Sequence, residues 1–203
     1  MKLEEAKKDY YRRLAREEGY NSRAAYKLLE TAKRYRLIKP GYKVLDLGCA
    51  PGGWVQVASE AVGENGLVVG VDLASMRLGL MPNVKLVQGD INDPQVIEKV
   101  RAIFNPPKDF PFDVLLSDLS PRISGVWELD HFKQVELTFR SLALGDELLR
   151  VGGSAMLKVF DGERFTELRR EAGKRFQTVT IVKPKASRSE SSEIYLVCLT
   201  KKP

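Results

Sequence analysis

Seven short apolar runs, separated for the most part by helical stretches, constrain the fold of this chain more than any other feature. The runs lie at residues 43–48, 67–72, 84–88, 112–117, 153–160, 177–183 and 193–199, with helical stretches near 53–62, 94–104, 128–150 and 162–174. Parallel strands need a crossover, usually a helix, and strands covered on both faces are almost continuously apolar. The alternation therefore predicts an α/β fold with helices on both faces of a mostly parallel sheet.

The last two apolar runs are an exception to this alternation. Only residues 184–192 separate them, which is too few for a crossover helix, so we expect an antiparallel hairpin there. The predicted fold is a doubly wound, mostly parallel seven-stranded sheet with the last strand antiparallel. A length of 203 residues suits one domain, and we expect residues 1–203 to form it.

The composition disfavours several classes of protein. No segment approaches the ~20 apolar residues that a membrane span needs, and the charged residues 1–13 do not resemble a secretory signal. Cys49 and Cys198 lack the spacing of metal ligands, and His131 is the single histidine. We therefore expect a cytoplasmic protein with reduced thiols, without a metal ion and without a membrane partner.

The net charge of +6 is concentrated at the N-terminal end. Residues 1–43 hold 13 Lys and Arg against 6 Asp and Glu, whereas the rest of the chain is close to neutral. Two helices are predicted there, at 2–18 and 22–37, and Asn21 and Ser22 can cap the second. A basic module on a neutral body indicates a polyanionic partner, most simply nucleic acid. The alternative is a solvated helix stabilised by ion pairs along its own surface.

A glycine-rich loop follows the first apolar run, in the stretch VLDLGCAPGGW at residues 44–54. In open α/β sheets, ligands bind beyond the carboxyl ends of the strands, and this loop lies at such an end. Gly48, Gly52 and Gly53 allow the backbone to approach a ligand closely. The helix that begins near Gly53 presents free N–H groups to an anion. The loop is therefore a candidate binding site.

The spacing of this loop disfavours a nicotinamide dinucleotide. The dinucleotide fingerprint is G-x-G-x-x-G, and its second glycine admits the pyrophosphate. Here Cys49, Ala50 and Pro51 follow Gly48, so that glycine is missing, and Pro51 also lacks a backbone donor. A smaller anion such as an amino-acid carboxylate fits better, which argues against a nicotinamide-dependent oxidoreductase.

Acidic residues accompany the first three predicted strands. Asp46 lies in the first run, Asp72 ends the second and Asp90 follows the third. A carboxylate at Asp72 can accept hydrogen bonds from two ribose hydroxyls, and one at Asp90 can reach an adenine amino group. Together with a carboxylate-binding loop, these features describe S-adenosylmethionine. The alternative is that all three are turn acids at strand ends.

Three further charged residues lie at predicted strand ends near the cofactor loop. Asp118 in SDLSP ends the fourth strand, Lys158 interrupts the apolar run MLKVF, and Glu193 begins the last strand. An ammonium among apolar residues is costly without a partner, so Lys158 is a candidate reactive group. Alternatively, Lys158 snorkels to solvent at a strand end, and Glu193 is an ordinary acid at a strand edge. Lys27, on the second helix, would then be simply solvated.

From about residue 20 to residue 200 the chain resembles the FtsJ/RrmJ-type RNA ribose 2′-O-methyltransferases. The resemblance rests on SRAAYKL, DLGCAPGGW, VDL, GDI, SDLSP followed by SG, LKVF and SRSESSEIYLV. It implies the Rossmann-like fold of S-adenosylmethionine-dependent methyltransferases, with S-adenosylmethionine as cofactor. It also implies a catalytic tetrad of Lys27, Asp118, Lys158 and Glu193, and the cofactor-binding residues Gly52, Trp54, Asp72, Asp90 and Asp118.

Two other residues take their interpretation from this resemblance. Trp54 is expected to form a wall of the pocket for the methionine part of the cofactor; the alternative is a packing residue on the helix after the loop. Arg122 in SPRISG departs from the family pattern, because bacterial members tend to carry Asn after this proline. We expect the departure to affect a contact to RNA or to the methionine end of the cofactor.

The activity implied is transfer of a methyl group from S-adenosylmethionine to a ribose 2′-hydroxyl of RNA. The length looks most like that of the enzymes that act on a uridine of large-subunit ribosomal RNA. We therefore expect ribosomal RNA or a ribosomal particle as partner, a monomeric enzyme, and residues 1–41 as a basic helical RNA-binding portion. Methylation of tRNA and a non-catalytic RNA-binding role in ribosome assembly are the alternatives.

Lys158 has two possible roles in such a reaction. It acts as general base on the 2′-hydroxyl, or as a cation it steers the 2′ oxygen and stabilises the developing alkoxide. Asp118 and Glu193 are expected to position Lys158 and the hydroxyl. The sequence leaves both roles open.

Overall fold

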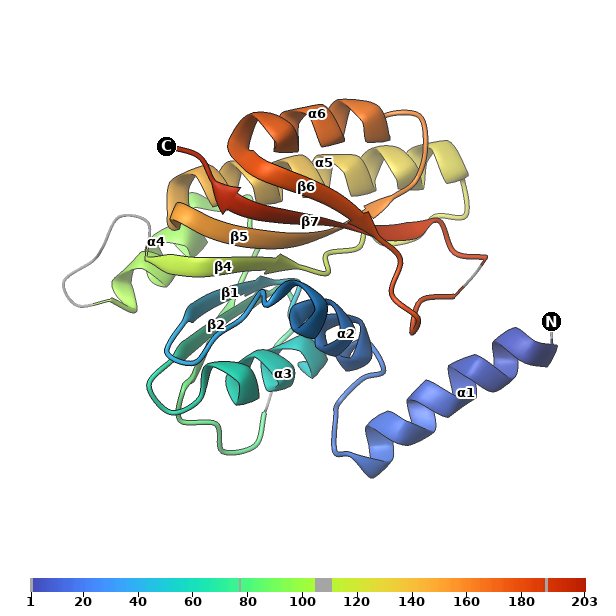
Figure 1. Ribbon diagram of the computed structural model, residues 1–203, viewed down its shortest axis with the longest axis horizontal. Helices are drawn as coiled ribbons and strands as arrows, with labels where there is room; N and C mark the ends of the chain where they lie inside the picture. Colours follow the sequence, from blue (N-terminus) through green and yellow to red (C-terminus); the bar gives the residue numbers. More distant parts are fainter. Residues whose placement is uncertain (1, 77, 105–110, 189) are drawn as a thin grey trace.

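A seven-stranded sheet in the order β3-β2-β1-β4-β5-β7-β6 forms the centre of the protein (Figure 1). The computed structural model describes residues 2–76, 78–104, 111–188 and 190–203. The strands are β1 (Lys43–Leu47), β2 (Leu67–Asp72), β3 (Val84–Gln88), β4 (Phe112–Ser117), β5 (Leu149–Phe160), β6 (Phe176–Val182) and β7 (Glu193–Lys201). Strands β1 to β5 pair in parallel, and β7 pairs antiparallel with both β5 and β6. The predicted sheet is confirmed.

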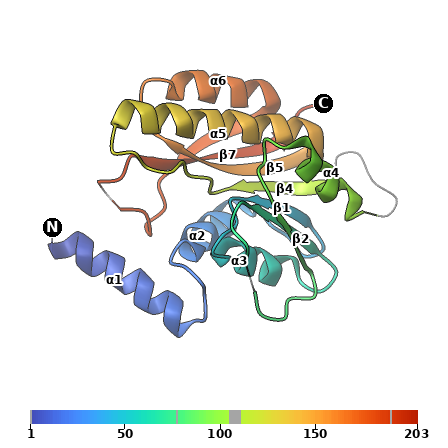
Figure 2. The same ribbon diagram turned by 180° about the vertical axis from the view of Figure 1, so that it is seen from behind.

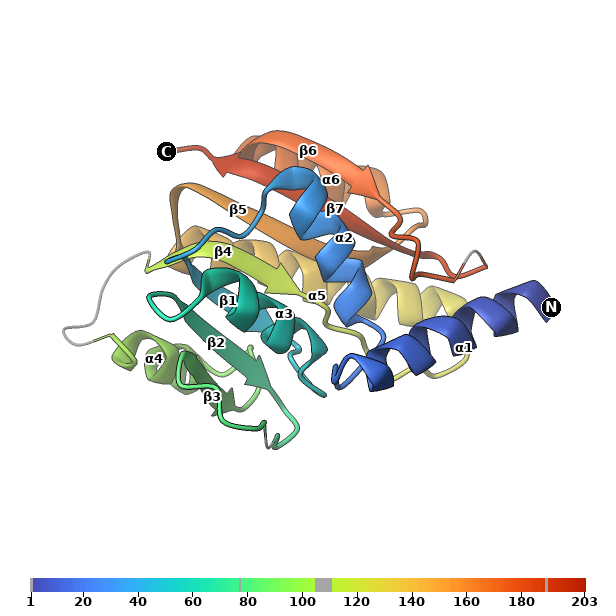
Figure 3. The same ribbon diagram turned by 60° about the horizontal axis from the view of Figure 1, so that its bottom comes forward.

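Helices cover both faces of this sheet. Figure 3 shows α2 (Ala25–Tyr35) and α3 (Gly53–Val62) over one face. Figure 2 shows α4 (Pro94–Ala102), α5 (Trp127–Leu148) and α6 (Phe165–Arg175) over the other. The pleat of β1 divides its side chains between the two layers, because Val44 packs with the cluster under α2 and α3 while Leu45 packs with the cluster under α4 to α6.

Helix α1 (Lys2–Glu17) lies apart from these two layers (Figure 1). It is joined to α2 by a short turn, and Ala15 is one of its buried residues. The predicted pair of N-terminal helices is therefore present. In the described parts of the chain, no helix is long and apolar enough to cross a membrane.

The predicted cap of the second helix is wrong. Helix α2 begins at Ala25 rather than at residue 22, and its N-cap residue Ala24 offers no side-chain hydrogen bond. A tight turn in which Ala25 N donates to Ser22 O precedes the helix, so Ser22 lies too early to cap it. Asn21 instead donates from Nδ2 to Pro51 O, 2.9 Å away, and so joins this turn to the glycine loop.

The boundary between α5 and β5 also differs from the prediction. The helix ends at Leu148 and the strand begins directly at Leu149, whereas the sequence pattern placed the strand start at residue 153. The pairing of β5 with β4 shifts register between Phe112 and Val114. Gly152 and Gly153 lie in this irregular part of β5. Because glycine is atypical of strand interiors, these two residues interrupt the apolar pattern, and the sequence did not indicate the beginning of the strand.

The carboxyl ends of β1, β2, β3 and β4 meet at one edge of the sheet. The strand order changes direction between β1 and β4, which is the place where open α/β sheets bind ligands. Hydrogen bonds hold the segments after these strands together: Gly48 N donates to Val71 O at 2.9 Å, and Asp118 N donates to Leu47 O at 3.1 Å. The fold thus places the glycine loop beside the SDLSP segment.

Candidate active site

A cavity of about 430 Å³ opens at this edge of the sheet. The segments that follow β1, β2, β3 and β4 line it, with Gly48, Ala50, Asp72, Asp90, Asp118 and Arg122 among the lining residues. Three of the predicted cofactor residues, Asp72, Asp90 and Asp118, therefore lie in one cavity. Their carboxylates come from three different strand ends, which is the arrangement that a ligand with several separated polar groups requires.

Gly48 is one position where the backbone conformation demands glycine. Its φ is +74°, and an added Cβ would lie 3.0 Å from both the backbone nitrogen and the Cα of Leu119. A side chain here would push the SDLSP segment away from the loop after β1. Close contact between these two segments therefore depends on Gly48.

Asp72 fixes the loop after β1 as well as lining the cavity. Its Oδ2 accepts a hydrogen bond from Ala50 N at 2.9 Å, and its Oδ1 accepts one from Ala74 N at 2.8 Å. Each carboxylate oxygen has a second lone pair, so the group can still accept from a ligand. Asp90 is exposed, and its Oδ1 accepts from Asn92 N at 2.9 Å. Both carboxylates fit the hydroxyls and the amino group of a nucleoside.

Asp46 occupies a different environment from these two acids. It is fully buried, does not line the cavity, and neither carboxyl oxygen has a hydrogen-bond partner. Burial, together with the negative charges of Asp118 and Asp72, raises the pKa of Asp46 well above its usual range. Burial without a hydrogen-bond partner thus disfavours the charged form of this carboxyl.

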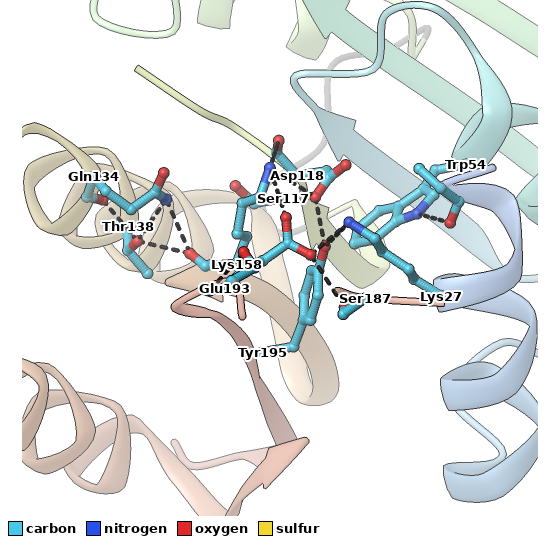
Figure 4. Close-up of polar contacts among 12 residues, drawn as sticks. Lys27, Trp54, Ser117, Asp118, Gln134, Thr138, Lys158, Ser187, Glu193 and Tyr195 are labelled. Carbon is cyan, nitrogen blue, oxygen red and sulfur yellow. Dashed lines mark hydrogen bonds and ion pairs between the residues drawn. The ribbon is translucent and has the colours of Figure 1, made fainter. Parts of the chain in front are cut away.

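The structure brings the four residues of the predicted tetrad together (Figure 4). The Lys158 Nζ atom lies 3.0 Å from Asp118 Oδ1 and 3.7 Å from Glu193 Oε2, and it donates to the carbonyl oxygen of Asp118 at 3.0 Å. Pairing in the sheet explains this meeting, because β5 is the neighbour of both β4 and β7 and Phe160 lies opposite Glu193. Lys158 is 7% exposed, so it does not snorkel to solvent.

Lys27 enters the site from α2, on the other side of Glu193. Its Nζ donates to Glu193 Oε1 at 2.5 Å and to the hydroxyl of Tyr195 at 3.1 Å. Only 6% of Lys27 is exposed, so it is not the solvated helix lysine of the alternative interpretation. Glu193 thus bridges two ammonium groups.

Tyr195 belongs to this cluster although the sequence analysis did not find it. The hydroxyl donates to Asp118 Oδ1 at 2.8 Å and accepts from Lys27. Burial, followed by the negative charges of Asp118 and Glu193, raises its pKa well above the usual value, so it remains a neutral phenol. A signal was available, because Glu193 and Tyr195 are two residues apart on one strand and therefore lie on the same face.

Two polar residues of α5 hold the backbone at Lys158 and were also missed. Gln134 Nε2 donates to the Lys158 carbonyl oxygen at 3.2 Å, and Thr138 Oγ1 donates to the same oxygen at 2.9 Å. Both side chains are buried. Their spacing of four residues places them on one helix face, which is the pattern that could have indicated a shared partner.

Trp54 and Gly52 lie outside the cavity lining. Trp54 is 3% exposed, donates from Nε1 to Ala24 O at 2.8 Å, and packs its ring 5.7 Å from the ring of Tyr195. Gly52 is the N-cap of α3, and an added Cβ there would lie 2.5 Å from Leu78 Cδ2. Trp54 therefore supports the tetrad through Tyr195, and a direct cofactor contact by either residue stays a prediction.

The charges of the tetrad determine the ionisation of Glu193. Burial alone would raise the pKa of this carboxyl, but the ammonium groups of Lys27 and Lys158 outweigh burial and leave the pKa below its usual value. Ser187 Oγ also donates to Glu193 Oε1, at 3.1 Å. The carboxylate is therefore charged at neutral pH and balances the two lysines.

Replacement of Glu193 with glutamine is expected to lower the free energy of unfolding at neutral pH. The variant leaves two buried ammonium groups with a single carboxylate, and breaking a buried pair in this way costs about 3–5 kcal/mol. Because the folded pKa is lowered, the stabilisation is present above the unfolded value of about 4.3 and disappears as pH falls through the folded value. Denaturant titrations at several pH values measure the difference.

Glu190 provides the matched control, because it is an exposed glutamate of the same segment. We expect Glu190→Gln to match the unchanged protein at every pH, while the deficit of Glu193→Gln shrinks in acid. A deficit of the same size at neutral and acid pH would contradict the proposed charge balance.

Within the described residues, no group of three or more His, Cys, Asp or Glu has the geometry to hold a metal ion. The sheet with its reversed last strand, the glycine loop at the strand-order reversal and the three separated acids describe a Rossmann-like fold with a nucleoside-binding cavity, as expected of a transferase that uses S-adenosylmethionine. The sequence pattern of the FtsJ-like methyltransferases matches residues 20–201. The chain belongs to this family.

Curated relatives agree with this assignment. The chain is 46% identical over 199 residues to the ribosomal RNA large subunit methyltransferase E of Nitrosopumilus maritimus, with 98% of each chain covered. It is 41% identical over 191 residues to the protein of that name from Methanocaldococcus jannaschii, covering 94% of this chain and 78% of the relative. The expectations of a methyltransferase and of S-adenosylmethionine as its cofactor are confirmed.

Solved structures show the same fold. A Plasmodium falciparum chain named as a ribosomal RNA methyltransferase is 33% identical, with a TM-score of 0.77, and the match covers 90% of this chain and 98% of that one. Fibrillarin of Aeropyrum pernix, crystallised with bound S-adenosylmethionine, has a TM-score of 0.56 at 17% identity, over 86% and 76% of the two chains. At that identity the second likeness concerns the fold alone.

Proposed function

We propose that the chain methylates a ribose 2′-hydroxyl of RNA and that its substrate is a uridine of large-subunit ribosomal RNA. The observation that carries this proposal is the position of Asp118. One side of this residue lines the cofactor cavity, and its Oδ1 lies 3.0 Å from the Lys158 ammonium. A polar, charge-balanced cluster therefore adjoins the cavity, where a hydroxyl nucleophile has to meet the methyl group.

S-adenosylmethionine bound in the cavity supplies an electrophilic methyl group on its sulfonium. The residues of the chain orient the acceptor and manage its proton. Glu193 and the cavity-lining Asp118 hold the Lys158 Nζ in place, so a 2′ oxygen aligned for in-line attack in the cavity would meet this group. A neutral Lys158 takes the hydroxyl proton itself, whereas an ammonium donates to the oxygen while the proton leaves to the Asp118 carboxylate.

The proposed substrate rests on the names of the relatives rather than on the shape of the cavity. The proteins from Nitrosopumilus maritimus and Methanocaldococcus jannaschii are both named ribosomal RNA large subunit methyltransferases. At 46% identity over nearly the whole length, a shared substrate class is the most economical proposal. A uridine as the methylated nucleotide, residues 1–203 as one domain, a monomeric state and a cytoplasmic location are parts of the same proposal.

A methyl-transfer assay tests the proposal. Purified protein and radiolabelled S-adenosylmethionine are incubated with large ribosomal subunits that lack the modification, and in parallel with bulk tRNA. Nuclease digestion then locates the label. Label on a 2′-O-methyluridine of ribosomal RNA supports the proposal, whereas label in tRNA alone overturns the substrate. Cofactor binding without transfer to either RNA favours a non-catalytic assembly factor.

We also propose residues 1–41 as an RNA-binding portion. A groove of about 650 Å³ runs between α1 and the turn before α2, lined by Arg12, Arg16 and Arg23 among others. Burial lowers the pKa of Arg23, and the neighbouring positive charges of Arg188 and Arg12 lower it further. The clustered positive charges of these arginines attract a phosphate backbone that enters the groove.

Two neighbouring arginines of α1 provide a comparison. Arg12 lines the groove, whereas Arg13 lies 3.6 Å from Glu17 in an exposed ion pair and does not line it. We expect Arg12→Glu to weaken RNA binding and to reduce the slope of log affinity against log salt by about one, and Arg13→Glu to have a smaller effect. Filter binding over a range of salt concentrations measures both. Equal losses for the two variants would contradict the groove as the RNA path.

A further inference from the structure

A cluster of exposed apolar side chains lies where the segment after β4 enters α5. The exposed fractions are 60% for Ile123, 54% for Val126, 46% for Trp127, 42% for Leu129 and 51% for Phe132. These residues follow directly on Ser120, Pro121 and Arg122, which line the cofactor cavity. The apolar cluster is therefore continuous with the edge of the proposed active site, and the reaction described so far gives it no role.

Trp127 is held in this cluster by two aromatic neighbours. Its ring stacks on the ring of Phe160, with centroids 6.0 Å apart and planes at 20°, and on the ring of His131, with centroids 5.6 Å apart and planes at 23°. His131 is itself buried, and its Nε2 accepts a hydrogen bond from Arg164 N at 3.4 Å. The indole thus packs against two aromatic rings, while the residue remains 46% exposed.

The backbone before Trp127 is also held in place. The buried carboxylate of Asp130 accepts hydrogen bonds from Ser124 N at 2.8 Å and from Gly125 N at 3.1 Å. These hydrogen bonds, together with one from the Ser124 hydroxyl, lower the pKa of Asp130. The entrance to α5 is therefore pre-organised, and little conformational entropy is lost when a ligand covers the indole.

Strand β5 connects this aromatic surface to the tetrad. Phe160 lies two residues after Lys158, which corresponds to about 7 Å along a strand, and it pairs with Glu193 in the sheet. Because Phe160 also contacts the ring of Trp127, a nucleotide next to a ribose at Lys158 would be within reach of this indole. Arg122 is exposed and lines the cavity, so it adds a positive charge at the cavity edge.

We propose that Trp127 is a stacking platform for an unpaired base of the RNA next to the methylated nucleotide. Proteins that bind single-stranded nucleic acid combine such exposed aromatic rings with nearby cations, and sequence-specific RNA recognition stacks unpaired bases on aromatic side chains. The enzyme then takes its target from a single-stranded or locally opened segment. This proposal rests on the proposed RNA methylation and specifies the form of that substrate.

Tryptophan fluorescence tests the platform without requiring methyl transfer. The chain has two tryptophans, and Trp54 is 3% exposed, so quenching by a bound base reports on Trp127. The probes are a short single-stranded RNA that contains the target uridine and the same RNA with an abasic site beside that uridine. We expect the first RNA to quench the emission, and the abasic RNA or the Trp127→Phe variant to show little quenching.

Steady-state kinetics with the same RNA supply the second readout. Loss of one stacked base corresponds to a roughly tenfold to hundredfold loss of affinity, so Trp127→Ala should raise KM for RNA by that factor while kcat changes little. Trp127→Phe should recover part of the loss. Leu129→Ala removes a neighbouring exposed side chain that lacks a ring, and its KM should stay within about twofold of the unchanged protein.

Distinct results separate failure of the platform from failure of the proposed function. An active protein whose KM and quenching are unchanged by Trp127→Ala overturns the platform alone. A defect seen only with ribosomal particles, and not with the naked RNA, also overturns it, because the cluster would then contact a protein. A protein that methylates no RNA overturns the proposed function, while quenching by single-stranded RNA still measures stacking on Trp127.

Discussion

Lys158→Ala should reduce kcat by about 10²–10⁴-fold, the usual loss when a group that handles the reacting proton is removed. The Nζ atom of Lys158 lies 3.0 Å from Asp118 Oδ1 and 3.7 Å from Glu193 Oε2, so the substitution removes the amine that these two carboxylates hold in place. The cofactor cavity is formed by other residues, and its affinity for S-adenosylmethionine should change by less than about threefold. Single-turnover kinetics and calorimetry measure the two quantities.

A matched control and a conservative variant sharpen this test. Lys85 is an exposed lysine of β3, and Lys85→Ala should leave kcat unchanged. Lys158→Arg keeps the positive charge but cannot accept a proton. Substantial activity of Lys158→Arg identifies a steering cation, whereas a kcat as low as that of Lys158→Ala identifies a general base. Normal turnover by Lys158→Ala would exclude Lys158 from the reaction altogether.

Folding of Lys158→Ala needs its own measurement. The substitution leaves Asp118 and Glu193 opposite Lys27 alone, and uncompensated buried charge destabilises proteins by about 3–5 kcal/mol. Lys158→Met fills more of the vacated volume while still removing the amine. Equal losses of kcat in both variants, with cofactor binding retained in both, would show that the chemical step and not the fold is affected.

Asp72→Ala should weaken S-adenosylmethionine binding by about a hundredfold, the second large effect that we expect. A hydrogen bond to a charged acceptor contributes about 1.5–3 kcal/mol, and Asp72 can accept from two ribose hydroxyls. The carboxylate also holds Ala50 N at 2.9 Å, so the variant loosens the loop after β1 as well. Calorimetry measures the dissociation constant, and kcat at saturating cofactor should fall far less than in Lys158→Ala.

Two further variants separate these contributions of Asp72. Asp72→Asn keeps the size and one acceptor oxygen but removes the charge, and it should lose less affinity than Asp72→Ala. Glu64 is an exposed acid after α3 that does not line the cavity, so Glu64→Ala should bind the cofactor normally. An unchanged dissociation constant in Asp72→Ala would remove this residue from the cofactor site.

Much of the fold could be predicted because local periodicity was unambiguous. Strands β2, β3 and β4 have the predicted bounds, since each is a short apolar run between clear turns. The predictions failed where a tertiary contact altered the local preference. The turn before α2 places Ser22 too early to cap the helix, and the irregular pairing of β4 with β5 extends β5 back to Leu149.

The sequence could indicate which residues form the candidate site, but not which of them contact one another. The resemblance named Lys27, and the structure explains its burial, because it reaches a carboxylate 166 positions away in the sequence. Tyr195 escaped notice because a tyrosine in an apolar strand is typical of a core residue, and its hydroxyl gains meaning only from its partners. For Trp54, the position at the exit of a ligand loop suggested a ligand contact. In the structure its ring packs against Tyr195 and lies outside the cavity lining.

The sequence by itself determined the class of fold, the order of its elements and the set of chemical groups available at the strand ends. These properties depend on composition and on periodicity within a few residues, which local sequence contains in full. Only the tertiary structure decided that Asp118 faces both the cavity and Lys158, that Arg12 and not Arg13 lines a groove, and that Trp127 lies exposed on Phe160. Such contacts depend on strand register and on helix packing between distant segments, so they exist only once the chain has folded.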